Sequence, residues 1–176
     1  MSEKTVFNYF AIKESLVLDL GETTLISLRD TLADPDLSPV EAVLEILSGQ
    51  LAGLTSWLTA QDDWAQARVV LLRFGTLIGS TPSLRAYQRD MTDRQVTVAA
   101  EILARRTGMS PDNPEPQIAA AALLALWPFQ FQALCRHLPH ARTSEELHDE
   151  VSADVGRAAQ FIDAGLSSFA SARRSL

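Results

Sequence analysis

TVFNYFAIKE, residues 5–14, is the stretch that decides how this chain is organised. Its three aromatic residues, Phe7, Tyr9 and Phe10, predict the end of a short helix, and a break of two residues follows them. Lys13 and Glu14 then open a long amphipathic helix, which should run from about residue 12 to about residue 32. The stretch therefore predicts that a small N-terminal element is joined by one long helix to the remainder of the chain.

The remainder of the sequence predicts helices only. Apolar residues recur at spacings of three and four, and no alternating apolar and polar run lies between hairpin turns. Ser38-Pro39-Val40-Glu41 has the pattern of a capping box, and Pro128 should kink the helix that contains it. The expected helices run from residue 39 to about 58, 64 to 78, 82 to 108, 117 to 137 and, after a capping Thr143, to about 171. We therefore expect an all-α fold.

Composition excludes several classes of protein. The net charge of −7 is the wrong sign for a chain that binds nucleic acid over a broad surface. A single cysteine, Cys135, excludes an intramolecular disulfide and the usual multi-cysteine zinc sites. Met1 does not lead into a signal peptide, and the longest apolar run, residues 118–129, is too short to span a bilayer. We therefore expect a cytoplasmic protein with no membrane partner.

The sequence offers little support for catalysis or metal binding. Glu145 and His148 have the Glu-x-x-His spacing of di-iron bundles, but such sites need a second copy, and the sequence has none. Glu145 is also explained by its position in the first turn of a helix, where the helix dipole favours an acid. No glycine-rich phosphate loop or nucleophile elbow occurs. We expect neither an enzyme nor a cofactor.

Residues 2–14 resemble the TetR family of transcription regulators. In that family this segment holds the end of the DNA-recognition helix and the start of the helix that joins the reading head to the ligand-binding body. Ser2 and Thr5 match the second half of the family's Gly-Val-Ser-Xaa-Xaa-Thr run, and Met1 stands where the family usually has valine. The resemblance implies a remnant of the helix-turn-helix head in residues 1–11 and a ligand-binding and dimerisation domain in residues 12–176.

The two helices that precede the recognition helix in the family are absent from this sequence. Because a GTG codon encodes valine inside a gene and methionine at a bacterial start, one expectation is that the natural start lies upstream and the natural protein has a full head. A naturally short chain is the open alternative. Without the first two helices the recognition helix has no scaffold to dock it in the major groove, so we expect no specific DNA binding by residues 1–176 alone.

The resemblance also implies three sets of residues. With a full head, the DNA contacts would be Glu3, Lys4, Thr5, Asn8, Tyr9 and Lys13. An effector pocket among the body helices would be lined by Trp57, Arg73, Phe74, Tyr87, Gln88, Met91, Gln95, Trp127, Phe131 and Cys135, although an aromatic stripe is more often core than pocket. The last two helices would form a four-helix homodimer interface through Ile118, Ala122, Phe129, Val151, Val155, Ala159, Ile162, Leu166 and Phe169.

The function implied by the resemblance is that of a ligand-responsive regulator of the repressor type, whose effector and operator the sequence does not identify. A homodimer, a small-molecule effector and, with a full head, operator DNA are the expected partners. The alternative is a headless module that dimerises or binds small molecules without binding DNA.

Overall fold

The computed structural model describes residues 21–172, and all of its described elements are helices, as expected. The six predicted DNA contacts and the boundary between residues 11 and 12 lie outside the described residues. A helical segment covers residues 21–31. It is followed by α2 (Pro39–Thr59), α3 (Trp64–Ser80), α4 (Pro82–Thr107), α5 (Pro114–Leu124), α6 (Leu126–His137) and α7 (Ser144–Ala172). No strand occurs within residues 21–172.

Capping residues mark several helix ends close to the positions that the sequence predicted. The Ser38 hydroxyl accepts from the backbone N–H of Glu41 at 3.1 Å, and the Glu41 carboxylate accepts from the backbone N–H of Ser38 at 2.8 Å. These two hydrogen bonds form the predicted capping box. The backbone N–H of Ser38, and after it the Ser38 side chain, lowers the pKa of the Glu41 carboxyl. Gly108 ends α4 with φ of 66°, the left-handed conformation that glycine adopts without strain. Thr143 caps α7 by accepting from Glu146 N–H at 3.1 Å.

The sequence predicted one helix over residues 117–137, but the structure has two helices in this region, so the prediction of a single helix was wrong. The first begins earlier, at Pro114, and the chain breaks at Ala125 before α6 begins. Pro128 explains the break, because proline has no N–H to donate to the carbonyl four residues before it and its ring crowds that turn. The disruption therefore falls in the turn that precedes Pro128, as the kink was expected to.

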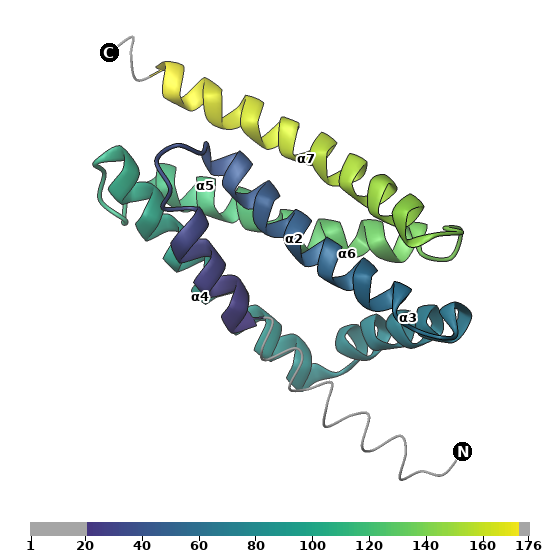
Figure 1. Cartoon of the computed structure of the whole chain (residues 1–176). Coiled ribbons are helices and arrows are strands. Elements are labelled where there is room, and N and C mark those ends of the chain that lie inside the picture. The colour runs from purple at the N-terminus through teal and green to yellow at the C-terminus, as the bar shows by residue number, and fades with distance from the viewer. Residues whose placement is uncertain (1–20, 173–176) are drawn as a thin grey trace.

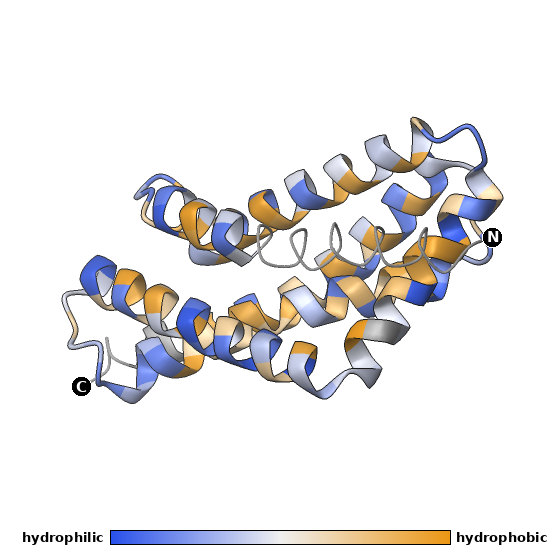
Figure 2. Ribbon diagram, turned by 90° about the horizontal axis from the view of Figure 1, so that it is seen from below, coloured by the Kyte–Doolittle hydropathy of each residue, from blue (hydrophilic) through white to orange (hydrophobic). Residues whose placement is uncertain are grey.

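The helices pack in a bundle in which α7 covers one side (Figure 1). Helix α7 packs on α2 and α6, whereas α4 packs chiefly on α5, and the segment 21–31 lies beside α4. Hydrophobic and hydrophilic residues occupy different sides of the helices (Figure 2), which is the amphipathic pattern that drives such packing. The largest fully buried side chains of the described residues are Leu28, Leu32, Val43, Leu47, Leu58, Ile102, Leu123, Leu126, Leu138, Leu147 and Val151.

The stretch Pro114–His137 is long and apolar enough, by length and composition, to cross a membrane, with a mean hydropathy of 1.6. In this fold it is interrupted at Ala125 and packs against other helices of the bundle. Only 33% of its most apolar window is buried within the chain. Of its large apolar side chains, Ile118 and Phe131 are exposed.

Arg106, near the end of α4, fixes the turn that follows the segment 21–31. Its guanidinium donates to the carbonyl oxygens of Leu32, at 2.8 Å, and of Leu37. These carbonyls have no partner within a continuing helix, because the chain turns here before α2 begins. One side chain thus ties the end of the first helical segment to the far end of α4.

Replacing Arg106 by alanine should lower the free energy of unfolding by about 2 kcal/mol, because two charge-assisted hydrogen bonds to part-buried carbonyls are lost. Arg106→Lys should recover part of the loss, because a lysine ammonium group can donate to one of the two carbonyls but lacks the fork that lets arginine reach both. Urea denaturation followed by circular dichroism measures both. Equal stability of Arg106→Ala and the unsubstituted chain would contradict this role.

Trp64, the first residue of α3, packs its ring against the core, but its buried indole nitrogen has no hydrogen-bond partner. An unpaired buried donor stabilises nothing. Trp64→Phe keeps an aromatic ring and removes only this group and part of the contact area. We therefore expect a change in the free energy of unfolding below about 1 kcal/mol in the same urea experiment. A larger loss would show that the indole N–H has a partner in solution.

Candidate functional site

Gln50 of α2 joins the segment 21–31 to α6 through two hydrogen bonds. Its carbonyl oxygen Oε1 accepts from the indole Nε1 of Trp127 at 3.0 Å. Its amide nitrogen Nε2 donates to the hydroxyl of Thr24 at 2.9 Å. Thr24 is buried, and Trp127 is half-buried against the core. Three helices that are distant in sequence therefore meet at one side-chain amide.

Two residues of α4 approach the same segment at its described start. The amide of Gln95 donates to the carbonyl of Gly21 at 3.4 Å. The side chain of Met91 lies 3.0 Å from the position that a Cβ atom on Gly21 would occupy, so only glycine permits this approach without a shift of the methionine. Met91 and Gln95 are four residues apart and both are buried, which places them on one face of α4.

At this junction one indole ring, the Met91 side chain and the amides of Gln50 and Gln95 lie around the segment 21–31, and effector sites combine apolar and polar groups in this way. Three of the ten residues predicted to line a pocket, Met91, Gln95 and Trp127, lie at it. Gln50 and Thr24 belong to the same junction and were not predicted. The signal for Gln50 was present, since it lies one turn from Leu47 and Leu54 on the apolar side of α2.

None of the contacts described for this junction involves the other seven predicted pocket residues. Trp57, Arg73 and Gln88 are exposed, while Phe74, Tyr87 and Cys135 are half-buried. Burial raises the pKa of the Cys135 thiol. Phe131 is 39% exposed and packs against Gly75 of α3, where a Cβ atom would meet the ring. Their assignment to an effector pocket stays a prediction.

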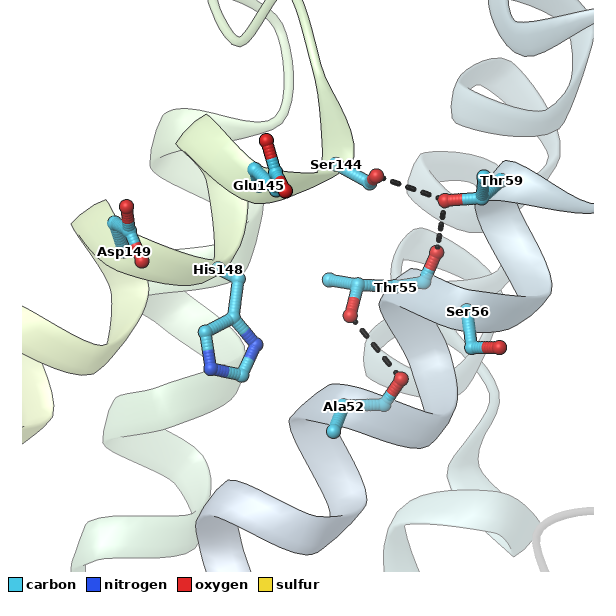
Figure 3. A pocket seen from close by; sticks show the side chains of 8 residues that line it. All are labelled: Ala52, Thr55, Ser56, Thr59, Ser144, Glu145, His148 and Asp149. Carbon is cyan, nitrogen blue, oxygen red and sulfur yellow. Dashed lines mark hydrogen bonds between the residues drawn. The ribbon is translucent and has the colours of Figure 1, made fainter.

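A separate hollow of about 260 Å³ lies between α2 and the start of α7 (Figure 3). The Thr59 hydroxyl lies 2.9 Å from the Thr55 carbonyl and 2.8 Å from the Ser144 hydroxyl, which ties the two helices together at the rim. The hollow is lined by Ala52, Thr55, Ser56, Thr59, Ser144, Glu145, His148 and Asp149. None of these is a predicted pocket residue, and the four from α2 lie on the side of that helix opposite Gln50.

A buried carboxylate, that of Asp154, organises the contact between α6 and α7. It accepts from Arg136 at 3.0 Å and from the His137 ring at 2.9 Å, and it also contacts Arg157. The other ring nitrogen of His137 lies 3.0 Å from Glu150. The hydrogen bond from His137 and the positive charges of Arg157 and Arg136 lower the pKa of Asp154, against the opposing effect of burial.

The residues predicted for the dimer interface divide into two groups in the structure. Val151, Val155 and Ala159 are buried in the core of the chain, so their surface is already covered. Ile118 is 60% exposed, and Ala122, Phe129, Ile162 and Leu166 are half-buried. The Phe169 side chain lies outside the described residues.

Phe161 was not predicted for this surface, although it is 87% exposed. It follows Asp154 by seven residues, about two turns, and so lies on the same side of α7 as Asp154. The apolar periodicity of α7 passes through its neighbour Ile162 and not through Phe161.

Comparison with known proteins gives one match. Residues 37–153 match a family model of TetR C-terminal domains that is described as the MftR C-terminal domain. The matched region begins just before α2 and includes the first ten residues of α7. No curated protein and no solved structure matches the chain.

Proposed function

Because the chain belongs to the TetR family, with a C-terminal domain of the kind described for MftR, we propose that it is a ligand-responsive transcriptional regulator, acting as a repressor. Its role is regulatory rather than catalytic, and it acts in the cytoplasm. The effector binds in the junction of α2, α4, α6 and the segment 21–31, against Trp127, Met91 and Gln95. The single observation that supports this choice concerns the hydrogen bonds of the junction. Each of them ends either on the segment 21–31 or on Gln50, and Gln50 itself donates a hydrogen bond to that segment.

The proposed mechanism is a shift between two conformations of that segment. In the family the helix that contains it leads to the DNA-reading head. An effector that binds better when the segment is displaced must favour the displaced state, and the heads then lose their spacing on DNA. An effector with equal affinity for both states would change nothing.

We also propose a homodimer formed by α5, α6 and α7 of two copies. The exposed side chains of Ile118, Phe131 and Phe161, one on each of these helices, support this choice. A two-fold arrangement would bury the same surface on both copies. Two reading heads, where present, would then be held at a fixed spacing.

Transcript sequencing in the native cells tests the regulatory role. Deletion of the gene should raise a small set of transcripts, and reintroduction of the gene with its upstream sequence should restore them. An unchanged transcript profile after deletion, under conditions in which the protein is made, would contradict the proposal.

A second candidate function is a headless dimerisation or small-molecule-binding module. It is favoured by the N-terminal charges, because Lys4 and Lys13 are offset by Glu3 and Glu14 and leave no net attraction to phosphate. An electrophoretic shift assay with residues 1–176 and DNA flanking the gene separates the two. A specific complex at nanomolar protein and physiological salt would exclude the headless function.

A further inference from the structure

We propose that Gln50 is a positioning residue that couples α6 to the segment 21–31, so that occupancy of the effector site at Trp127 is transmitted to that segment. The proposal rests on the proposed function, because it names the residue through which the same site would act. It is drawn from the two hydrogen bonds that leave the Gln50 amide in opposite directions, to Trp127 and to Thr24.

The chemistry of Trp127 fixes the orientation of this amide. An indole nitrogen can only donate, so the atom that faces it must be the carbonyl oxygen of Gln50. The amide NH₂ then necessarily faces the hydroxyl of Thr24. A flip of the amide would set two donors against each other at Trp127. The two hydrogen bonds are therefore linked, because loss of the first removes what holds the second in place.

The linkage indicates the chemical class of an effective ligand. A molecule with a carbonyl or carboxylate oxygen can accept the Trp127 N–H in place of Gln50, while an apolar body contacts the indole ring. Gln50 is then released from α6, and its hold on Thr24 weakens. A ligand without such an acceptor would leave both hydrogen bonds intact and would not displace the segment by this route.

A second hydrogen bond between α6 and α2 offers a control. The amide of Gln130 donates to the backbone carbonyl of Leu47 at 3.2 Å and is part-buried, like that of Gln50. It does not continue to the segment 21–31. Trp64 offers another control, because Trp64→Phe makes the same chemical change as Trp127→Phe at an indole that has no hydrogen-bond partner.

Amide hydrogen exchange of the full chain, without ligand or DNA, tests the coupling. Trp127→Phe should speed exchange in residues 21–31 about fivefold to tenfold, which corresponds to the net loss of about one hydrogen bond. Gln50→Leu and Thr24→Val should do the same, and the double variant Trp127→Phe with Thr24→Val should exceed neither single variant by much. Trp64→Phe and Gln130→Leu should leave residues 21–31 at the rate of the unsubstituted chain.

Two results would overturn the proposal. One is unchanged exchange of residues 21–31 in Trp127→Phe. The other is an equal acceleration in residues 21–31 and in α7, since general loss of stability would speed both. Because the experiment uses neither effector nor DNA, the coupling can fail while the regulatory role survives. The transcript experiment can likewise fail while the coupling is observed.

Discussion

Phe161→Glu is expected to convert a dimer of this chain into a monomer at micromolar concentration. The phenyl ring is 87% exposed in the single chain, so most of its surface is free to be buried by a second copy. Aromatic residues that become buried at the centre of an interface contribute about 2–4 kcal/mol each to binding. In a two-fold dimer the change occurs twice, and each glutamate would also carry a charge into an apolar contact.

Sedimentation velocity of the purified chain measures this effect directly. The unsubstituted protein should sediment as a dimer of the 19.3 kDa chain, and Phe161→Glu as the single chain. Ile26→Glu is the matched control, because Ile26 is 57% exposed on the segment 21–31 and lies outside α5, α6 and α7. A dimer that survives Phe161→Glu, or a monomer in the unsubstituted chain, would refute the proposed interface.

The second large effect is expected at Asp154. Asp154→Asn should lower the free energy of unfolding at neutral pH by about 3 kcal/mol, because a buried carboxylate that accepts charge-assisted hydrogen bonds is replaced by a neutral amide. The partners that lose it, Arg136 and Arg157, are largely exposed and can turn to solvent, which limits the loss. Asp163→Asn, an exposed position on the same helix, should change stability little.

The effect of Asp154 should also depend on pH with a definite sign. The pKa of Asp154 in the folded chain lies below its ordinary value of 3.8. Its stabilisation is therefore fully present above that value and is lost as the pH falls through the lower, folded-state pKa. Urea denaturation from neutral pH down to about pH 3 should show the difference between Asp154→Asn and the unsubstituted chain shrinking only at the acidic end. A difference that shrinks near neutral pH would identify another group as its source.

Local signals in the sequence predicted the helices well. The Ser38 and Glu41 capping box, the Gly108 end of α4 and the disruption before Pro128 each depend on residues within one turn of the feature. Such features follow from hydrogen bonds and backbone angles that neighbouring residues determine. The all-α fold was predicted correctly for the same reason, since helical periodicity is also local. The family was predicted from the resemblance of residues 2–14, and the match over residues 37–153 confirms it.

The candidate site was predicted less completely because its contacts are not local. Gln50 pairs with residues 26 and 77 positions away, and nothing in helical periodicity selects those partners. Met91, Gln95 and Trp127 were selected as apolar, polar and aromatic residues on helix faces that could line a pocket, but so were exposed residues such as Trp57. Which side of a helix faces a neighbour, and which residue of that neighbour it meets, depends on how the whole bundle packs.

The interruption at Ala125 has a mechanical consequence. A continuous helix from Pro114 to His137 would be a stiff rod, and any tilt at one end would swing the other end against α4. Here α5 is anchored chiefly to α4, and α6 chiefly to α7. Because Pro128 donates no hydrogen bond to the carbonyl of Leu124, we expect the chain to bend more readily here than within either helix, so that α6 follows α7 while α5 stays on α4. Replacing Pro128 by alanine would restore the missing helical hydrogen bond, and α5 and α6 would then be expected to move together as one continuous helix.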